Sequence, residues 1–179
     1  EDGGIAAMRE KPELDFLTHL TRKQIHVMTV GLLLANVMSL LDATIINTAL
    51  PAIIGDLHGI SCMGLIVSVF LLGMSVFTPL WSKFGERMGN KKAFELAVVL
   101  FIAGSALEGL SPDILFFVCA RLLMGIGAGG LGSIPYIIFG NVYENLHTRS
   151  SILGFVSAVY GAASITGPLV GGLIVDSFS

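Results

Sequence analysis

The chain has 179 residues, of which 54% are hydrophobic and only 13% are charged. A soluble domain carries about 25% charged residues, so this composition excludes an ordinary soluble domain and predicts a membrane protein. The net charge of −3 gives no reason to expect a nucleic-acid partner. Cys62 and Cys119 lie in apolar runs without a second ligand at metal-binding spacing, so we interpret them as packing residues.

The first residues differ from the rest of the chain. Residues 1–21 are polar and charged with no sustained period, and we expect residues 1–24 to form a cytoplasmic tail. The chain opens with Glu1 and ends at Ser179, just past an apolar segment. We therefore expect it to be a fragment, or a truncated reading of a longer gene.

Five apolar segments follow the tail, each with about the length of a transmembrane helix. A span needs about 20 apolar residues, because each helical residue rises about 1.5 Å through a hydrocarbon core about 30 Å thick. The third segment is the weakest, because Glu95 and Glu108 interrupt it. The fold class is therefore all-α and polytopic, with no soluble domain. The predicted spans are residues 25–50, 60–82, 93–110, 114–139 and 150–175.

The basic residues predict the direction in which the chain crosses the membrane. Of the ten Lys and Arg residues, all except Arg121 fall before the first span, between the second and third, or between the fourth and fifth. The other loops, around residues 56–58 and 111–113, contain none. Because loops rich in Lys and Arg stay in the cytoplasm, we expect a multi-pass protein of the cell membrane with a cytoplasmic N-terminus.

Asp42 and Arg121 are the two charges that we expect at the same depth in the membrane. Asp42 lies eight residues before Leu50, at the outer end of the first span, and Arg121 lies eight residues after Asp113, at the outer start of the fourth. Both therefore sit about 12 Å inside the outer boundary, where they can form an ion pair or share a water network. Charges at this depth usually mark a pathway or a proton relay; the alternative is a static pair that fixes helix register. Asn47, one turn beyond Asp42, either lines a cavity or hydrogen-bonds a neighbouring helix.

Glycines recur at a spacing of four residues in two of the predicted spans. Gly125 and Gly129 form one smooth strip in the fourth span, and Gly167 and Gly171 form another in the fifth. Pro168 removes a backbone donor and is expected to bend the fifth helix. Such strips let another backbone approach closely, which suits either a moving interface or simple tight packing.

The segment 82–92 is predicted to be a short charged loop on the cytoplasmic side. Gly85 and Gly89 would allow tight turns there. Glu86 and Arg87 can pair with helix ends or with a facing bundle. By composition alone it is an ordinary positively charged loop.

Taken in order, these segments resemble the major facilitator superfamily, and most closely its fourteen-helix drug:proton antiporter branch. Residues 41–51 resemble the first-span motif L-D-x-T-I-[IV]-N-x-A-L-P, and residues 82–92 resemble the loop motif G-x-L-x-D-R-x-G-[RK]-[RK]. Residues 121–127 resemble the fourth-span motif R-x-x-Q-G-x-G, and residues 154–172 resemble the fifth-span antiporter motif. The chain departs from these patterns at Ser82, Phe84, Glu86, Asn90, Met124 and Ala163.

The resemblance implies five helices of an N-terminal six-helix bundle, which faces a second bundle around a central cavity. It implies proton coupling at Asp42 and Arg121. It also implies a cytoplasmic gate at Gly85, Glu86, Arg87, Gly89 and Lys91, with Glu86 in place of Asp lengthening the reach of the latch. The antiporter motif, which seals helix contacts during switching, would comprise Gly154, Gly167, Pro168, Gly171 and Gly172.

We interpret the chain as part of a secondary active transporter that exports small, drug-like or amphipathic compounds in exchange for protons. The sequence offers no nucleophile–base set, metal-spaced cluster or phosphate loop, so we expect no enzymatic site and no cofactor, with the proton gradient as the energy source. The expected partners are the lipid bilayer, a small-molecule substrate and the missing C-terminal helices of the same protein. Two alternatives stay open: an importer or metabolite carrier of the same superfamily, and a truncated remnant or membrane subunit that does not transport alone.

Cysteine labelling tests the predicted topology. In a background with Cys62 and Cys119 replaced by Ser, single cysteines at positions 57 and 112 should react with a membrane-impermeant maleimide added to intact cells. A cysteine at position 90 should react only after permeabilisation, because loops with basic residues stay inside. Labelling of position 90 from the exterior, or of 57 or 112 only from the cytosol, would overturn this topology.

Overall fold

A computed structural model describes residues 21–56, 63–143 and 145–178, and all regular structure in these residues is α-helical. The described part of each predicted apolar segment corresponds to one helix, so the all-α prediction is confirmed. The N-terminal tail up to residue 20, Cys62 and the predicted outer loop at 57–58 lie outside the described residues. The helices are α3 (Arg22–Asp56), α4 (Met63–Met88), α5 (Asn90–Gly109), α6 (Ile114–Val142) and α7 (Leu146–Phe178).

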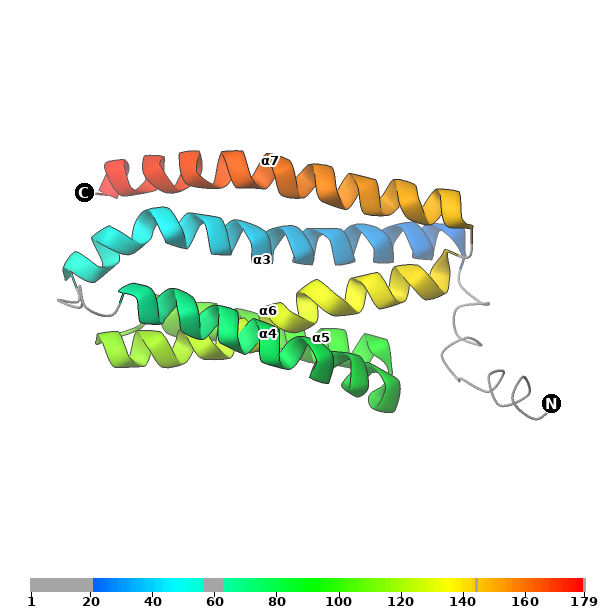
Figure 1. The fold of residues 1–179 in the computed structure, drawn as a ribbon, viewed down its shortest axis with the longest axis horizontal. Helices are drawn as coiled ribbons and strands as arrows, with labels where there is room; N and C mark the ends of the chain where they lie inside the picture. The colour runs from blue at the N-terminus through cyan, green and yellow to red at the C-terminus, as the bar shows by residue number, and fades with distance from the viewer. Residues whose placement is uncertain (1–20, 57–62, 144, 179) are drawn as a thin grey trace.

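The helices are arranged in two layers (Figure 1). α3 and α7 lie side by side, while α4 and α5 both pack against α6. α6 also contacts α3 and so joins the two layers. Successive helices run in opposite directions, so the start of α3, the α4–α5 junction and the start of α7 lie at one end of the bundle. This alternation is what a chain that crosses a membrane repeatedly requires.

Glycines of α6 allow its close packing against two neighbours. A Cβ atom added at Gly125 or Gly129 would collide with the backbone of α4, at the carbonyl oxygens of Phe70 and Met74. A Cβ atom at Gly127 would lie 2.5 Å from the backbone nitrogen of Phe101, on α5. The strip of Gly125 and Gly129 therefore faces α4, and Gly127 faces α5, as a helix with 3.6 residues per turn dictates.

Trp81 fixes the contact between α4 and α6. Its side chain is buried, and its Nε1 donates a hydrogen bond of 2.7 Å to the carbonyl oxygen of Ile126. That indole N–H would otherwise be an unpaired donor in an apolar environment, which is costly. The hydrogen bond thus sets the register of α4 on α6.

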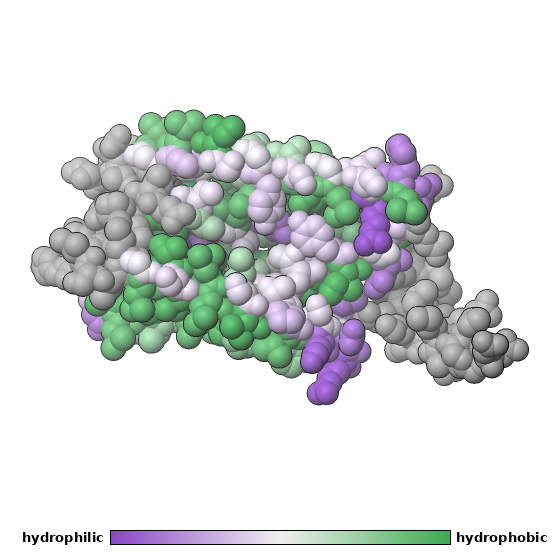
Figure 2. Space-filling view, in the orientation of Figure 1, coloured by the Kyte–Doolittle hydropathy of each residue, from purple (hydrophilic) through white to green (hydrophobic). Residues whose placement is uncertain are grey.

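The outer surface of the bundle is apolar. Large hydrophobic side chains face outward on several helices, and the hydrophilic residues gather near the end of the bundle where the α4–α5 junction and the start of α7 lie (Figure 2). Lipid, rather than water, is the solvent that such a surface fits. Examples of these exposed side chains are Leu72, Val99, Ile102, Leu115 and Leu169.

Four of the helices, α3, α4, α6 and α7, are long and apolar enough to cross a membrane by length and composition. α5 has 20 residues and carries Lys91, Lys92, Glu95 and Glu108. That α5 also crosses stays a prediction, and its contact with α6 along most of its length is compatible with it.

The prediction of a loop at residues 82–92 is wrong. α4 continues through Met88 and α5 begins at Asn90, so helical hydrogen bonding occupies nearly the whole segment. The only break is at Gly89, whose φ of 92° is a conformation that side chains other than glycine rarely adopt. Gly85 does not form a turn: it is a buried helical residue, and a Cβ atom there would collide with the side chain of Asn90.

Two alanine substitutions in α6 test the packing role of its glycines. Gly127→Ala places a methyl group against the backbone of α5 and should destabilise the protein by about 1–3 kcal/mol through overpacking. Gly132→Ala is the matched control, because no described atom other than those of its own stretch of α6 lies within 4 Å of its Cβ position. It should stabilise by about 0.5–1 kcal/mol, since alanine is the better helix former. Melting temperatures of the purified protein in detergent should move in opposite directions; equal shifts would contradict the packing shown by the structure.

Candidate functional site

Arg121 and Asp42 form an ion pair between α6 and α3. The Nη1 atom of Arg121 donates a hydrogen bond of 2.9 Å to Oδ2 of Asp42. The Arg121 side chain is only 1% exposed, whereas that of Asp42 is 23% exposed. The two residues therefore lie at one level, as their positions in the predicted spans allow, and the guanidinium is enclosed by protein.

Glu108, near the end of α5, is a third charged member of this site. The same Nη1 atom of Arg121 lies 3.1 Å from Oε1 and 3.3 Å from Oε2 of Glu108. The Glu108 side chain is 10% exposed. One nitrogen of the guanidinium thus serves two carboxylates, which come from two different helices.

The sequence interpretation gave Glu108 no role and treated it only as a weakness of the third span. A periodic signal was present: the buried face of α5 is formed by Ala93, Ala97, Phe101 and Gly104. Glu108 lies four residues after Gly104, at helical spacing, and so continues this stripe. A carboxylate that continues a buried stripe should be expected to meet a cation.

The remaining surroundings of Arg121 are apolar or weakly polar. The ring of Phe70, on α4, lies under the guanidinium with 4.8 Å from Cζ to the ring centroid, which is a cation–π contact. The sulfur of Met124 lies 3.3 Å from Nη1. Met124 occupies the position where the family motif has glutamine, so a weak acceptor stands in place of an amide, and the carboxylates supply the strong acceptors.

The charges of the site do not cancel when all three groups are ionised. Two carboxylates and one guanidinium leave one net negative charge. A buried charge of this kind is costly in a low-dielectric environment. Binding of one proton to either carboxylate would make the cluster neutral.

Two further polar contacts hold α3 against α6, and both lie between Asp42 and the start of α3. Nδ2 of Asn36 donates a hydrogen bond of 3.2 Å to the carbonyl oxygen of Leu131. The hydroxyl groups of Thr29 and Tyr143 lie 2.9 Å apart. Together with Asp42, these residues recur every six or seven positions along α3, so that one face of the helix presents polar groups to α6.

Among the residues of the predicted antiporter motif whose surroundings are described, Gly167 makes a close helix contact. A Cβ atom there would collide with Thr44, two residues beyond Asp42 on α3. α7 therefore packs tightly on the turn of α3 that carries the carboxylate. Gly154 and Gly172 face open space among the described residues, and Pro168 is exposed within a continuous helix.

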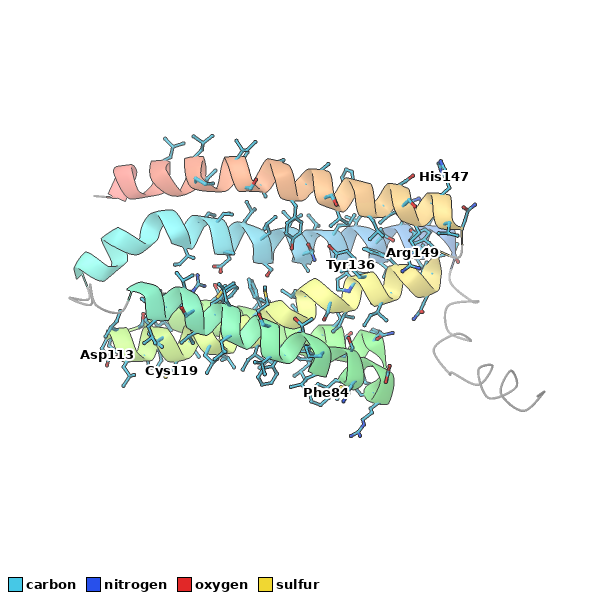
Figure 3. The ribbon with its side chains drawn as sticks, in the orientation of Figure 1. Phe84, Asp113, Cys119, Tyr136, His147 and Arg149 are labelled. Atoms are coloured by element: carbon cyan, nitrogen blue, oxygen red, sulfur yellow. The ribbon has the colours of Figure 1, made fainter. Side chains whose placement is uncertain are left out.

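Other predicted site residues lie away from the charge cluster or outside the described part. Glu86, Arg87 and Lys91 are exposed at the α4–α5 junction, at the opposite end of the bundle from Asp113, which Figure 3 shows beside the start of α6. Lys91 lies 3.9 Å from Glu95 in an exposed pair. The surroundings of Asn47 and of Gly171 lie outside the described residues.

A largely apolar groove with a volume of about 290 Å³ lies between α3 and α7. Asn36 and Tyr160 are among the lining residues, but the amide of Asn36 is buried and donates to the carbonyl oxygen of Leu131. The apolar lining includes Val30, Leu34, Val37, Phe155 and Val159.

Comparison with known families agrees with this architecture. The sequence model of the Major Facilitator Superfamily matches residues 32–179, which is most of the chain. The chain belongs to the major facilitator superfamily. This confirms the resemblance drawn from the four motifs. As a member of this transporter superfamily, the chain is part of a multi-pass membrane protein and not of an enzyme.

Curated relatives carry names of transporters and efflux pumps, two of them with multidrug in the name. The chain is 34% identical over 153 residues to the multidrug transporter protein MdtP of Bacillus subtilis, covering 86% of this chain and 28% of that protein. It is 35% identical over 148 residues to the efflux pump dotC of Dothistroma septosporum, covering 83% of this chain and 25% of that protein. It is 31% identical over 150 residues to the multidrug resistance protein 3 of Bacillus subtilis, covering 84% and 29%. The chain thus spans less than a third of the length of these relatives.

Proposed function

We propose that the protein containing this chain is a proton-coupled exporter of small, drug-like or amphipathic compounds. The observation that carries the proposal is the ion pair between the enclosed Arg121 and Asp42, two residues that the sequence predicts to lie at one depth in the membrane. The relatives named as multidrug transporters and efflux pumps support the direction of transport and the class of substrate. The proton gradient is the proposed source of energy.

Coupling follows from the position of the ion pair between two helices. When Asp42 is ionised, its attraction to Arg121 ties α3 to α6. A proton on Asp42 removes that charge and weakens the tie, so a conformation that separates the two helices becomes easier to reach. Proton binding and helix arrangement are thereby linked, and the linkage acts in both directions.

Of the pair, Asp42 is proposed to be the residue that exchanges the proton. Its side chain is 23% exposed, while Arg121 is enclosed. A proton carrier has to be reached from one side of the membrane at a time, so limited exposure suits it. Asn47 is proposed to line the cavity next to this site.

The loop motif and the antiporter motif are proposed to act in gating and in helix packing. Gly85, Glu86, Arg87, Gly89 and Lys91 are proposed to form the cytoplasmic gate. The exposure of Glu86, Arg87 and Lys91 at the α4–α5 junction leaves them accessible to a second bundle. The antiporter motif is proposed to seal α7 on α3, for which the close approach of Gly167 to Thr44 is the supporting contact.

The location and topology that we propose follow from the charges. The protein would lie in the cell membrane with its N-terminus in the cytoplasm, with α5 as one of its spans. Lys23, Lys83, Arg87, Lys91 and Arg149 all lie near the end of the bundle that includes the start of α3 and the start of α7. The positive-inside rule assigns that end to the cytoplasm.

The largely apolar groove between α3 and α7 fits the proposed class of substrate. Sites for small amphipathic ligands are mostly apolar, with a few polar groups that orient the ligand. The wall of this groove is almost entirely apolar, so it would take the apolar part of such a ligand.

Substitution of the proposed proton carrier tests this function in the complete gene product. Asp42→Asn keeps the shape of the side chain but removes its charge, so it should abolish gradient-driven efflux of ethidium from vesicles while the protein still inserts. Asp113→Asn is the matched control, because Asp113 is an exposed residue that caps α6 and asparagine caps a helix equally well.

Immunoblots of the membrane fraction show whether the variants accumulate equally. Normal efflux by Asp42→Asn would remove Asp42 from the mechanism. A gradient that drives ethidium inward in wild-type protein would instead indicate an importer.

A further inference from the structure

We infer that Glu108 is a second proton-binding residue, and that Asp42 and Glu108 share a single proton across Arg121. This inference rests on the proposed proton coupling and extends it. The observation behind it is the common Nη1 atom, which lies 2.9 Å from Asp42 and 3.1 Å from Glu108.

The geometry makes the two carboxylates equivalent partners of one cation. Both face the same guanidinium nitrogen, one from α3 and the other from α5. A single Nη group has two hydrogens, so each carboxylate can accept one. If a proton neutralises either carboxylate, the other remains to balance the buried guanidinium.

This arrangement solves a problem that a simple Asp–Arg pair would have. Arg121 is 1% exposed, and a buried guanidinium without a counter-charge is strongly destabilising. In a simple pair, protonation of Asp42 would create that unpaired charge, so the ion pair would resist proton binding. Glu108 removes this obstacle, because it keeps Arg121 paired while Asp42 holds the proton.

The charge of Arg121 is also balanced when the proton is on Glu108 instead of Asp42. When the proton sits on Glu108, Asp42 pairs with Arg121. The proton therefore belongs to the pair of carboxylates rather than to one residue, as expected for strongly interacting sites. The Asp42 side chain is 23% exposed among the described residues, and that of Glu108, at 10% exposed, is the more enclosed one.

The other described groups that contact the Arg121 guanidinium are uncharged. Among the described residues, the charged side chains that face Arg121 are Asp42 from α3 and Glu108 from α5. α4 contributes the ring of Phe70, and α6 itself contributes the sulfur of Met124.

A transport measurement tests the proton-binding role. Glu108→Gln in the complete gene product should abolish ethidium efflux driven by a proton gradient, because the remaining Asp42–Arg121 pair is already neutral and has no need of a proton. Glu108→Asp should restore proton-driven efflux in part. Glu95→Gln is the matched control, since Glu95 lies on the same helix but is exposed and pairs with Lys91.

The outcomes separate this inference from the proposed function. If Asp42→Asn loses efflux and Glu108→Gln keeps it, Glu108 is not a proton site, although the proposed function stands. If both variants keep efflux, the proposed function fails as well. Loss in both, with Glu95→Gln unaffected, supports the shared proton.

A stability measurement tests the shared counter-charge without relying on transport. Each single variant, Asp42→Asn or Glu108→Gln, leaves Arg121 with one carboxylate and should fold. The double variant leaves the buried guanidinium unpaired, so its folded-to-unfolded ratio in a denaturant titration should be at least about 100-fold lower than the two single effects predict together. Adding Arg121→Gln should recover most of that loss.

The control for this comparison combines Asp42→Asn with Glu95→Gln, whose effects should add independently. Additive effects in the Asp42→Asn/Glu108→Gln variant would overturn the inference, because they would mean that the two carboxylates do not share Arg121.

Discussion

The enclosed guanidinium of Arg121 is the constraint on which this bundle depends. With 1% of its side chain exposed, Arg121 requires counter-charges from its neighbours, and it finds them on α3 and α5. A buried cation that lost both would cost the protein several kcal/mol. Three helices are thereby held at one relative height, since a shift of one residue along any of them, about 1.5 Å, would stretch these hydrogen bonds. The charge cluster is thus a structural element as well as a chemical one.

The bundle contains two kinds of helix contact. α6 meets α4 and α5 through glycines and a buried tryptophan, where backbones approach closely and leave no room for water. α6 meets α3 through separated polar contacts, at Asp42, Asn36 and Thr29. Close-packed contacts of the first kind resist change, because any movement opens voids or causes collisions. The polar contacts of the second kind depend on charge and hydrogen bonding, as does the contact of Glu108, on α5, with Arg121. These are therefore the contacts that the proposed proton would change.

The sequence allowed the helices and a common level for Asp42 and Arg121 to be predicted, with an ion pair as one of two alternatives, but not the cluster as a whole. Long apolar runs are a local property, so all five helices were found, and residue counts from the span ends put Asp42 and Arg121 at one depth. Glu108 was missed because hydropathy does not fix the rotation of a helix; only the stripe of Ala93 and Phe101, read to its end, pointed to it. The segment 82–92 was taken as a loop because of its charges and glycines. Its helical hydrogen bonding instead continues until Gly89, where the positive φ ends it.

Infrared difference spectroscopy of the complete gene product measures the central claim directly, since it detects carboxyl groups that gain a proton. Acidification of the wild-type protein in lipid should produce a band from a buried protonated carboxyl group. This band should be lost in the Asp42→Asn variant, because the cluster is then neutral without a proton, and it should persist in Asp113→Asn. A band of unchanged size in Asp42→Asn would contradict the account, since the proton would then reside outside the cluster around Arg121.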